Sequence, residues 1–183
     1  MMTDQAMLSE KARPLARRLK NQTGKYLEAC KIVLSGHEQL KKEPALNTKT
    51  ALAPVTAFQM VHVASLLASK QYMQPTQIDA VNGVFAETLY GPPDDKWINF
   101  LQKYEENKQL DLSNQLIQFS EDVAVAMLGS AAGMAVGSPL AIMAKEFYIR
   151  NMGLVAEHFG DKETRDACIK MIKDIHTEPD QES

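Results

Sequence analysis

Apolar residues recur at alternating intervals of four and three along much of the chain, which is the spacing of one face of an α-helix. The first long segment, residues 9–42, shows this pattern most clearly. Its face is formed by Leu8, Ala12, Leu15, Leu19, Gln22, Tyr26, Cys30, Val33, His37 and Leu40. We expect Pro14 near the start of this helix, since proline is tolerated in a first turn. Alternation with a period of two, which is typical of a half-buried strand, does not extend over a useful length.

Turn and capping residues divide the rest of the chain into shorter helical segments. We expect helices over residues 54–72, 76–90, 138–159 and 161–176, the last of them capped by Asp161. Between them we expect a short helix that is capped by Asp94 or Asp95 and carries residues 97–104, and a helix that begins at Asp111 or Ser113 and runs to residue 137. Thr76 and Asp79 have the spacing of a capping box, and Gly91, followed by two prolines, ends that helix. The sequence therefore predicts an all-α, single-domain bundle of about six to seven helices over residues 9–176. In this prediction residues 1–8 are an N-terminal tail and residues 177–183 are a disordered C-terminal tail.

Residues 123–144 form a stretch without any charged side chain. The stretch is long enough to cross a bilayer core, which takes roughly 20 apolar residues. The order Gly137, Ser138, Pro139 argues against a single span, because glycine commonly ends a helix, serine caps the next one and proline suits its first turn. We therefore interpret the stretch as the buried, small-residue-rich centre of a soluble bundle, divided between two helices.

Three glycines at a spacing of four lie in this stretch: Gly129, Gly133 and Gly137. A glycine inside a helix costs about 1 kcal/mol relative to alanine, so it needs a compensating contact. The close approach of a second helix provides such a contact, and the glycines then form a helix-packing groove. The second helix belongs either to the same chain or to the other subunit of a homodimer.

The composition is that of an ordinary globular protein, with 45% hydrophobic residues, 23% charged residues and a net charge of −3. This net charge excludes a general nucleic-acid coat but is compatible with a local basic patch. Cys30 and Cys168 have no metal-ligand spacing and fall on apolar helix faces, which favours free thiols in a reducing compartment. We see no signal-peptide pattern near the N-terminus and expect a cytoplasmic protein.

Basic residues cluster on the first predicted helix, where Glu28 is the acidic residue among them. They are Lys11, Arg13, Arg17, Arg18, Lys20, Lys25 and Lys31. A basic amphipathic helix can meet an acidic partner or lie on an anionic membrane surface, and Arg17 and Arg18 are our candidate binding residues. Nucleic acid is disfavoured, because Tyr26 alone offers an aromatic ring for stacking on this helix. The simpler alternative is a solvated face whose cations pair with the acidic residues Asp161, Glu163, Asp166 and Asp174.

The second predicted helix carries an uncharged polar stripe within an otherwise apolar sequence. The stripe consists of Thr56, Gln59, His62, Ser65 and Ser69. A histidine near its ordinary pKa can act as an acid, a base or a ligand, so His62 and Gln59 are further candidate binding residues. The alternative is a half-buried helix that turns its more polar side outward, since no carboxylate partner for His62 is identifiable by spacing.

The sequence contains no recognisable catalytic or cofactor-binding motif, and its four histidines lack metal-ligand spacing, so we expect neither cofactor nor metal. We infer a non-enzymatic helical interaction module that binds another protein or associates with itself as a homodimer. The alternative is a binder of an apolar ligand or of an anionic membrane surface, through a Met- and Ala-rich interior or the basic first helix. A third hypothesis is an enzyme whose site is assembled from distant residues such as His62, Glu87 and His158.

Overall fold

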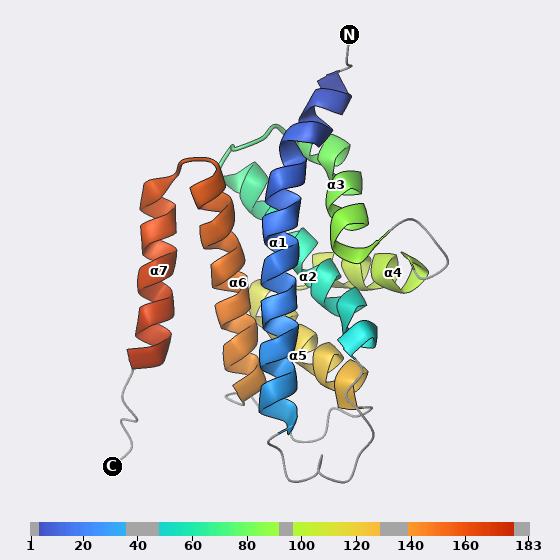
Figure 1. Cartoon of the computed structure of the whole chain (residues 1–183), viewed down its shortest axis with the longest axis vertical. Helices are drawn as coiled ribbons and strands as arrows, with labels where there is room; N and C mark the ends of the chain where they lie inside the picture. The colour runs from blue at the N-terminus through green and yellow to red at the C-terminus, as the bar shows by residue number, and fades with distance from the viewer. Residues whose placement is uncertain (1–3, 36–47, 92–96, 129–138, 178–183) are drawn as a thin grey trace.

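The computed structural model describes residues 4–35, 48–91, 97–128 and 139–177, and the structural statements below concern these ranges. They contain seven helices and no strand (Figure 1). The helices are α1 (Asp4–Ser35), α2 (Thr48–Ser69), α3 (Pro75–Tyr90), α4 (Trp97–Lys108), α5 (Leu112–Leu128), α6 (Pro139–His158) and α7 (Lys162–Thr177). The predicted all-α bundle is confirmed.

Helix α2 lies at the centre of the described bundle, where it packs against α1, α3, α4, α5 and α6. Every residue from 54 to 60 is buried, as expected for a helix with neighbours on all sides. Helix α1 runs along the length of the molecule, and α7 stands at the edge of the bundle beside α6 (Figure 1). Helix α7 packs chiefly against α6, and Cys168 is its buried residue.

The core divides into two clusters of buried side chains. The first joins α1, α2 and α3 and is mainly aliphatic, whereas the second is built around stacked aromatic rings. Phe58 of α2 and Phe119 of α5 stack with ring centroids 4.0 Å apart, and Tyr26 of α1 stacks on Phe147 of α6 at 4.4 Å. Because these rings come from four helices, the aromatic cluster fixes α1 and α6 relative to the centre of the bundle.

The uncharged stretch 123–144 was predicted to be the buried centre of the bundle, but in the described residues α2 takes that place. The described ends of the stretch are buried in part, since Val125 and Ile142 are 47% and 45% exposed, and they contribute to the second cluster. Its buried members there are Val123, Ala124, Met127, Leu140 and Ala144. Helix α5 ends at Leu128 and α6 begins at Pro139, so proline opens a helix here as predicted. The predicted groove of Gly129, Gly133 and Gly137 lies outside the described residues, so that hypothesis stays a prediction.

One described helical segment, Ala51–Ser69, is long and apolar enough to cross a membrane by length and composition alone. It belongs to α2, and 61% of it is buried inside the protein. A core helix of a soluble protein meets the same criteria, so this segment is weak evidence for a membrane span.

Local capping chemistry sets several of the helix boundaries. Asp111 accepts a hydrogen bond from the backbone N–H of Asn114 at the start of α5, and Asp161 accepts one from Thr164 at the start of α7. The predicted capping box at Thr76 is wrong. Helix α3 instead begins at Pro75, and the Gln77 side chain accepts a hydrogen bond from the backbone of Gln74, the N-cap residue. Proline suits this first position because its missing N–H has no partner to lose there.

Two helices begin earlier in the chain than predicted. Helix α1 starts at Asp4, inside the predicted tail of residues 1–8, so that Pro14 lies in the helix interior. Pro14 is exposed, and water can therefore satisfy the carbonyl group that it leaves without a partner. Helix α2 starts at Thr48 rather than at Pro54, which lies inside it. Packing of the flanking residues into the core outweighs the cost of proline at both positions.

A close helix contact occurs at Gly153 of α6, which the sequence analysis did not single out. A Cβ atom added at Gly153 would lie 3.1 Å from the Cβ atom of Cys168 on α7. The equivalent atom at Gly24, in the middle of α1, would meet nothing within 4 Å. The two glycines therefore occupy helix interiors of opposite character, one closely packed and one open.

We expect Gly153→Leu to lower the free energy of unfolding by about 1–3 kcal/mol, because the new side chain must displace α7 from α6. Gly24→Leu is the matched change in an exposed helix and should raise the free energy of unfolding by up to about 1 kcal/mol through helix propensity. Urea unfolding of both variants beside the parent measures the two effects. A stabilising shift in both variants would contradict the close contact between α6 and α7.

Candidate functional site

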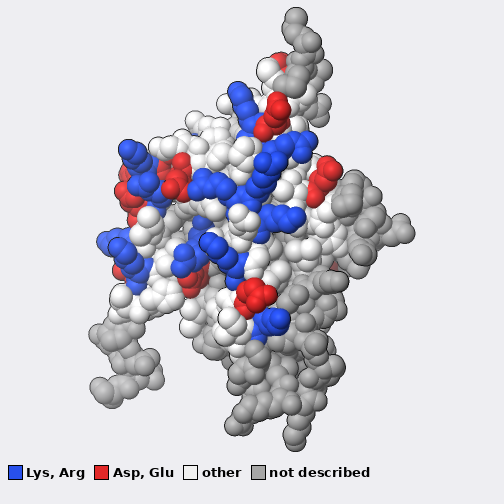
Figure 2. Space-filling model, in the orientation of Figure 1, with Lys and Arg blue, Asp and Glu red and all other residues white. Residues whose placement is uncertain are grey.

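Most basic residues of α1 are exposed, with the acidic Glu10 and Glu28 among them on the same helix. We call the six exposed cations Lys11, Arg13, Arg17, Lys20, Lys25 and Lys31 the basic face. Figure 2 shows basic side chains along α1 and, on the same side of the molecule, over the neighbouring helices. Five of the six form no ion pair with any residue in the described ranges: Lys11, Arg13, Arg17, Lys20 and Lys25. The surface therefore presents uncompensated positive charge, although the net charge of the chain is −3.

Arg18 differs from the basic face, because it is partly buried and forms an ion pair with Glu157 of α6. The predicted pairing with the acidic C-terminal region is wrong for the described residues. Asp161 instead accepts a hydrogen bond from the Tyr72 hydroxyl at 2.5 Å and two from Thr164, which together lower the pKa of its carboxyl to about 2. Asp166 pairs with Arg165 on its own helix. These acidic side chains thus leave the charge of the basic face unneutralised.

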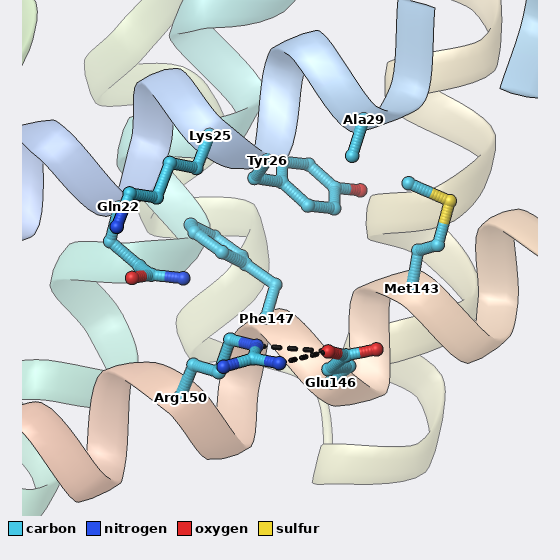
Figure 3. A pocket seen from close by; sticks show the side chains of 8 residues that line it. All are labelled: Gln22, Lys25, Tyr26, Ala29, Met143, Glu146, Phe147 and Arg150. Atoms are coloured by element: carbon cyan, nitrogen blue, oxygen red, sulfur yellow. Dashed lines mark hydrogen bonds and ion pairs between the residues drawn. The ribbon is translucent and has the colours of Figure 1, made fainter. Parts of the chain in front are cut away.

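A groove runs between α1 and α6 beside the basic face (Figure 3). It encloses about 290 Å³ and is lined by Gln22, Lys25, Tyr26, Ala29, Met143, Glu146, Phe147 and Arg150. The Arg150 guanidinium donates two hydrogen bonds to one oxygen of Glu146, at 2.9 and 2.6 Å. His176 near the end of α7 lies 3.1 Å from the other oxygen. Partial burial opposes ionisation of Glu146, but the bonds from Arg150 and His176 outweigh it and lower the pKa of the carboxyl.

A second hollow of about 220 Å³ extends this groove toward α7. The two hollows share Gln22 and Arg150 in their linings and therefore adjoin each other. Helix α7 adds one basic and several apolar side chains, namely Arg165, Cys168, Ile169 and Ile172. We call the combined hollow the α1–α6–α7 groove. It offers cations and apolar surface side by side, next to the basic face.

The structure places His62 in the aromatic cluster rather than in a cleft. Its ring lies edge-on to Phe58 and Tyr148, with centroids 4.4 and 4.7 Å away. Burial lowers the pKa of His62 to about 4, and its Nε2 atom has no hydrogen-bond partner within the described part of the chain. At neutral pH the side chain is therefore an uncharged imidazole among rings, which gives no support to a role in proton transfer.

Gln59 is fully buried and belongs to a polar network in the core. Its amide oxygen accepts a hydrogen bond from Thr23 at 2.7 Å. Its amide nitrogen donates to the Leu19 carbonyl at 3.0 Å and to the Asn151 side chain at 2.9 Å. The network joins α1, α2 and α6, so Gln59 is inaccessible to a binding partner and acts in the packing of the three helices. The prediction of Gln59 as a binding residue has no support in this geometry.

The three residues of the enzyme hypothesis are not brought together in the described part of the protein. His62, Glu87 and His158 share no hydrogen bond or ion pair there, and Glu87 is exposed on α3. No group of three or more histidine, cysteine or acidic residues in the described ranges has an arrangement that could hold a metal ion. Cys30 and Cys168 are free and buried, as predicted.

No family model, curated protein or solved structure matches the chain. The geometry of the basic face and the adjoining groove is therefore the basis for a functional proposal. Sequence analysis identified the basic face but missed the groove. One signal was available, because Glu146 and Arg150 have the i, i+4 spacing of an ion pair on one helix face.

Proposed function

We propose that this chain is a non-enzymatic helical interaction module that binds an acidic protein partner through the basic face of α1. The observation that carries the proposal is that five exposed cations of this face form no ion pair with any described residue: Lys11, Arg13, Arg17, Lys20 and Lys25. Charge of one sign on one surface attracts a partner of the opposite sign and accelerates its association. Self-association is a further form of the same proposal, since the chain as a whole is acidic.

An acidic protein fits this surface better than an anionic membrane does. A helix that lies in a membrane interface inserts its apolar side among the lipid chains. The apolar side of α1 includes Leu15 and Leu19, which are fully buried against the rest of the bundle. Between residues 11 and 25 the charged side of α1 is therefore the side available at the surface, and it can contact an acidic protein without any rearrangement of the fold. The exposed apolar residues of this helix, Met7, Ile32 and Val33, lie near its two ends.

Reversing two charges of the basic face tests the proposal. We expect the double variant Arg13→Glu, Arg17→Glu to bind poly-L-glutamate about tenfold more weakly than the parent at low salt, through lost attraction and new repulsion. The difference should shrink at high salt because exposed charges are screened. Arg18 is left unchanged, since its replacement would also break the ion pair with Glu157. Fluorescence anisotropy across a salt series measures the effect.

The double variant Lys170→Glu, Lys173→Glu is a matched control, because it changes the net charge equally at two exposed positions of α7. Its affinity for poly-L-glutamate should fall by less than that of the Arg13→Glu, Arg17→Glu variant, since neither lysine belongs to the basic face. Vesicles containing phosphatidylserine provide the competing target. Binding to the vesicles without binding to poly-L-glutamate would replace the protein partner with a membrane surface. Absence of salt-dependent binding to either target would overturn the proposal.

A further inference from the structure

The α1–α6–α7 groove has the length of a short helix. Its lining on α1 extends from Arg18 to Ala29, roughly 16 Å at the helical rise of 1.5 Å per residue. This distance corresponds to about three turns of an α-helix. The walls are themselves helices, whose backbone groups are already paired within each helix. An extended peptide would find no backbone partners there, whereas a helix brings its own backbone hydrogen bonds.

The side chains of the groove combine positive charge with exposed apolar surface. Basic side chains come from all three helices, but Arg18, Arg150 and Arg165 already form ion pairs with Glu157, Glu146 and Asp166. Lys25 of α1 is the cation of the lining that forms no ion pair within the described residues. Apolar contact area lies among the basic side chains, and Ile169 of α7 is 45% exposed at this position. Since α7 packs chiefly against α6, its side toward α1 borders the groove instead of a further helix.

We infer that the α1–α6–α7 groove receives a short amphipathic helix of the partner, with acidic residues beside one apolar stripe. This inference rests on the proposed function and specifies the partner segment. The acidic residues contact Lys25 and the basic face, and the apolar stripe covers Ile169 and its neighbours in the groove. A segment with the same charge but no apolar stripe gains only the electrostatic part of the binding free energy.

Two synthetic peptides of identical composition separate these contributions. Both contain Glu, Leu and Ala over about three helical turns, which is the length of the groove. In one peptide the leucines follow helical spacing on a single face, and in the other the order is shuffled. We expect the amphipathic peptide to bind the full chain about fivefold more tightly or better, because it buries apolar surface in the groove. Fluorescence anisotropy of the labelled peptides measures both affinities.

Ile169→Ser and Met171→Ser form a matched pair of variants. Both residues are on α7 with similar exposed fractions, 45% and 43%, but Met171 lines a neighbouring hollow to which Ile169 does not contribute. We expect Ile169→Ser to weaken binding of the amphipathic peptide about fivefold and to leave binding of the shuffled peptide unchanged. The reason is that only the amphipathic peptide covers this side chain. Met171→Ser should change neither affinity.

The outcomes distinguish this inference from the proposed function. Equal affinity for the two peptides, or equal effects of the two serine variants, overturns the groove as the docking site. If Arg13→Glu, Arg17→Glu still weakens both peptides in that case, the basic face remains the binding surface. If neither peptide binds while poly-L-glutamate does, the inference is overturned and the proposed function stands.

Discussion

Gln59→Ala is expected to lower the free energy of unfolding by about 3 kcal/mol, one of the two largest effects that we predict. The substitution removes three hydrogen bonds and leaves a cavity at the junction of α1, α2 and α6. The Asn151 amide oxygen loses its donor in a buried environment, which costs more than the loss of an exposed hydrogen bond, whereas the Leu19 carbonyl keeps the hydrogen bond from the Thr23 hydroxyl. Urea unfolding at neutral pH measures the change.

Gln102→Ala is the control, because Gln102 on α4 also forms a side-chain hydrogen bond but is exposed. Its effect should stay within about 0.5 kcal/mol, as is usual for surface substitutions. A double-mutant cycle with Asn151→Ala should show coupling to Gln59, since the two side chains share one hydrogen bond. A small effect of Gln59→Ala on unfolding, together with weakened binding of an acidic partner, would restore Gln59 as a binding residue.

The elements of the fold were predictable where local chemistry decides them. Helical spacing identified all seven helices. Asp161 caps α7 as predicted, and Asp111, one of the two predicted candidates, caps α5. The early starts of α1 and α2 were not predictable, because prolines at positions 14 and 54 normally mark helix beginnings. Packing of residues on both sides of each proline decides these boundaries, and packing partners cannot be derived from local spacing.

The candidate site was predictable only in part for the same reason. Helical spacing placed the cations of α1 on one surface, since the pattern involves a single helix. The groove depends on how α1, α6 and α7 pack together, and the pairing of Arg18 with Glu157 joins positions far apart in the sequence. The polar stripe of α2 illustrates the limit. Its spacing was correct, but spacing does not distinguish a solvated side from the buried side that Gln59 occupies.

His62 is expected to make the stability of the fold depend on pH between about 6.5 and 4. Burial among Phe58 and Tyr148 lowers the pKa of His62 in the folded protein to about 4, from 6.5 for a solvated histidine. Below pH 6.5 the unfolded chain therefore binds a proton that the folded chain excludes, and the stability falls as the pH is lowered. The decrease in the free energy of unfolding that His62 causes, relative to neutral pH, should reach about 2 kcal/mol by pH 5 and level off below pH 4.

His62→Phe isolates this contribution, because phenylalanine fills a similar space and cannot be protonated. Carboxyl groups also titrate in this range, so the informative quantity is the difference in unfolding free energy between the variant and the parent, measured by urea unfolding at each pH. At pH 7 we expect the variant to be at least as stable as the parent, since the buried Nε2 atom without a partner is removed. From pH 6.5 to 4.5 the difference should grow steadily in favour of the variant. A difference independent of pH would mean that His62 is protonated equally in the folded and unfolded chains, and therefore that water reaches its ring.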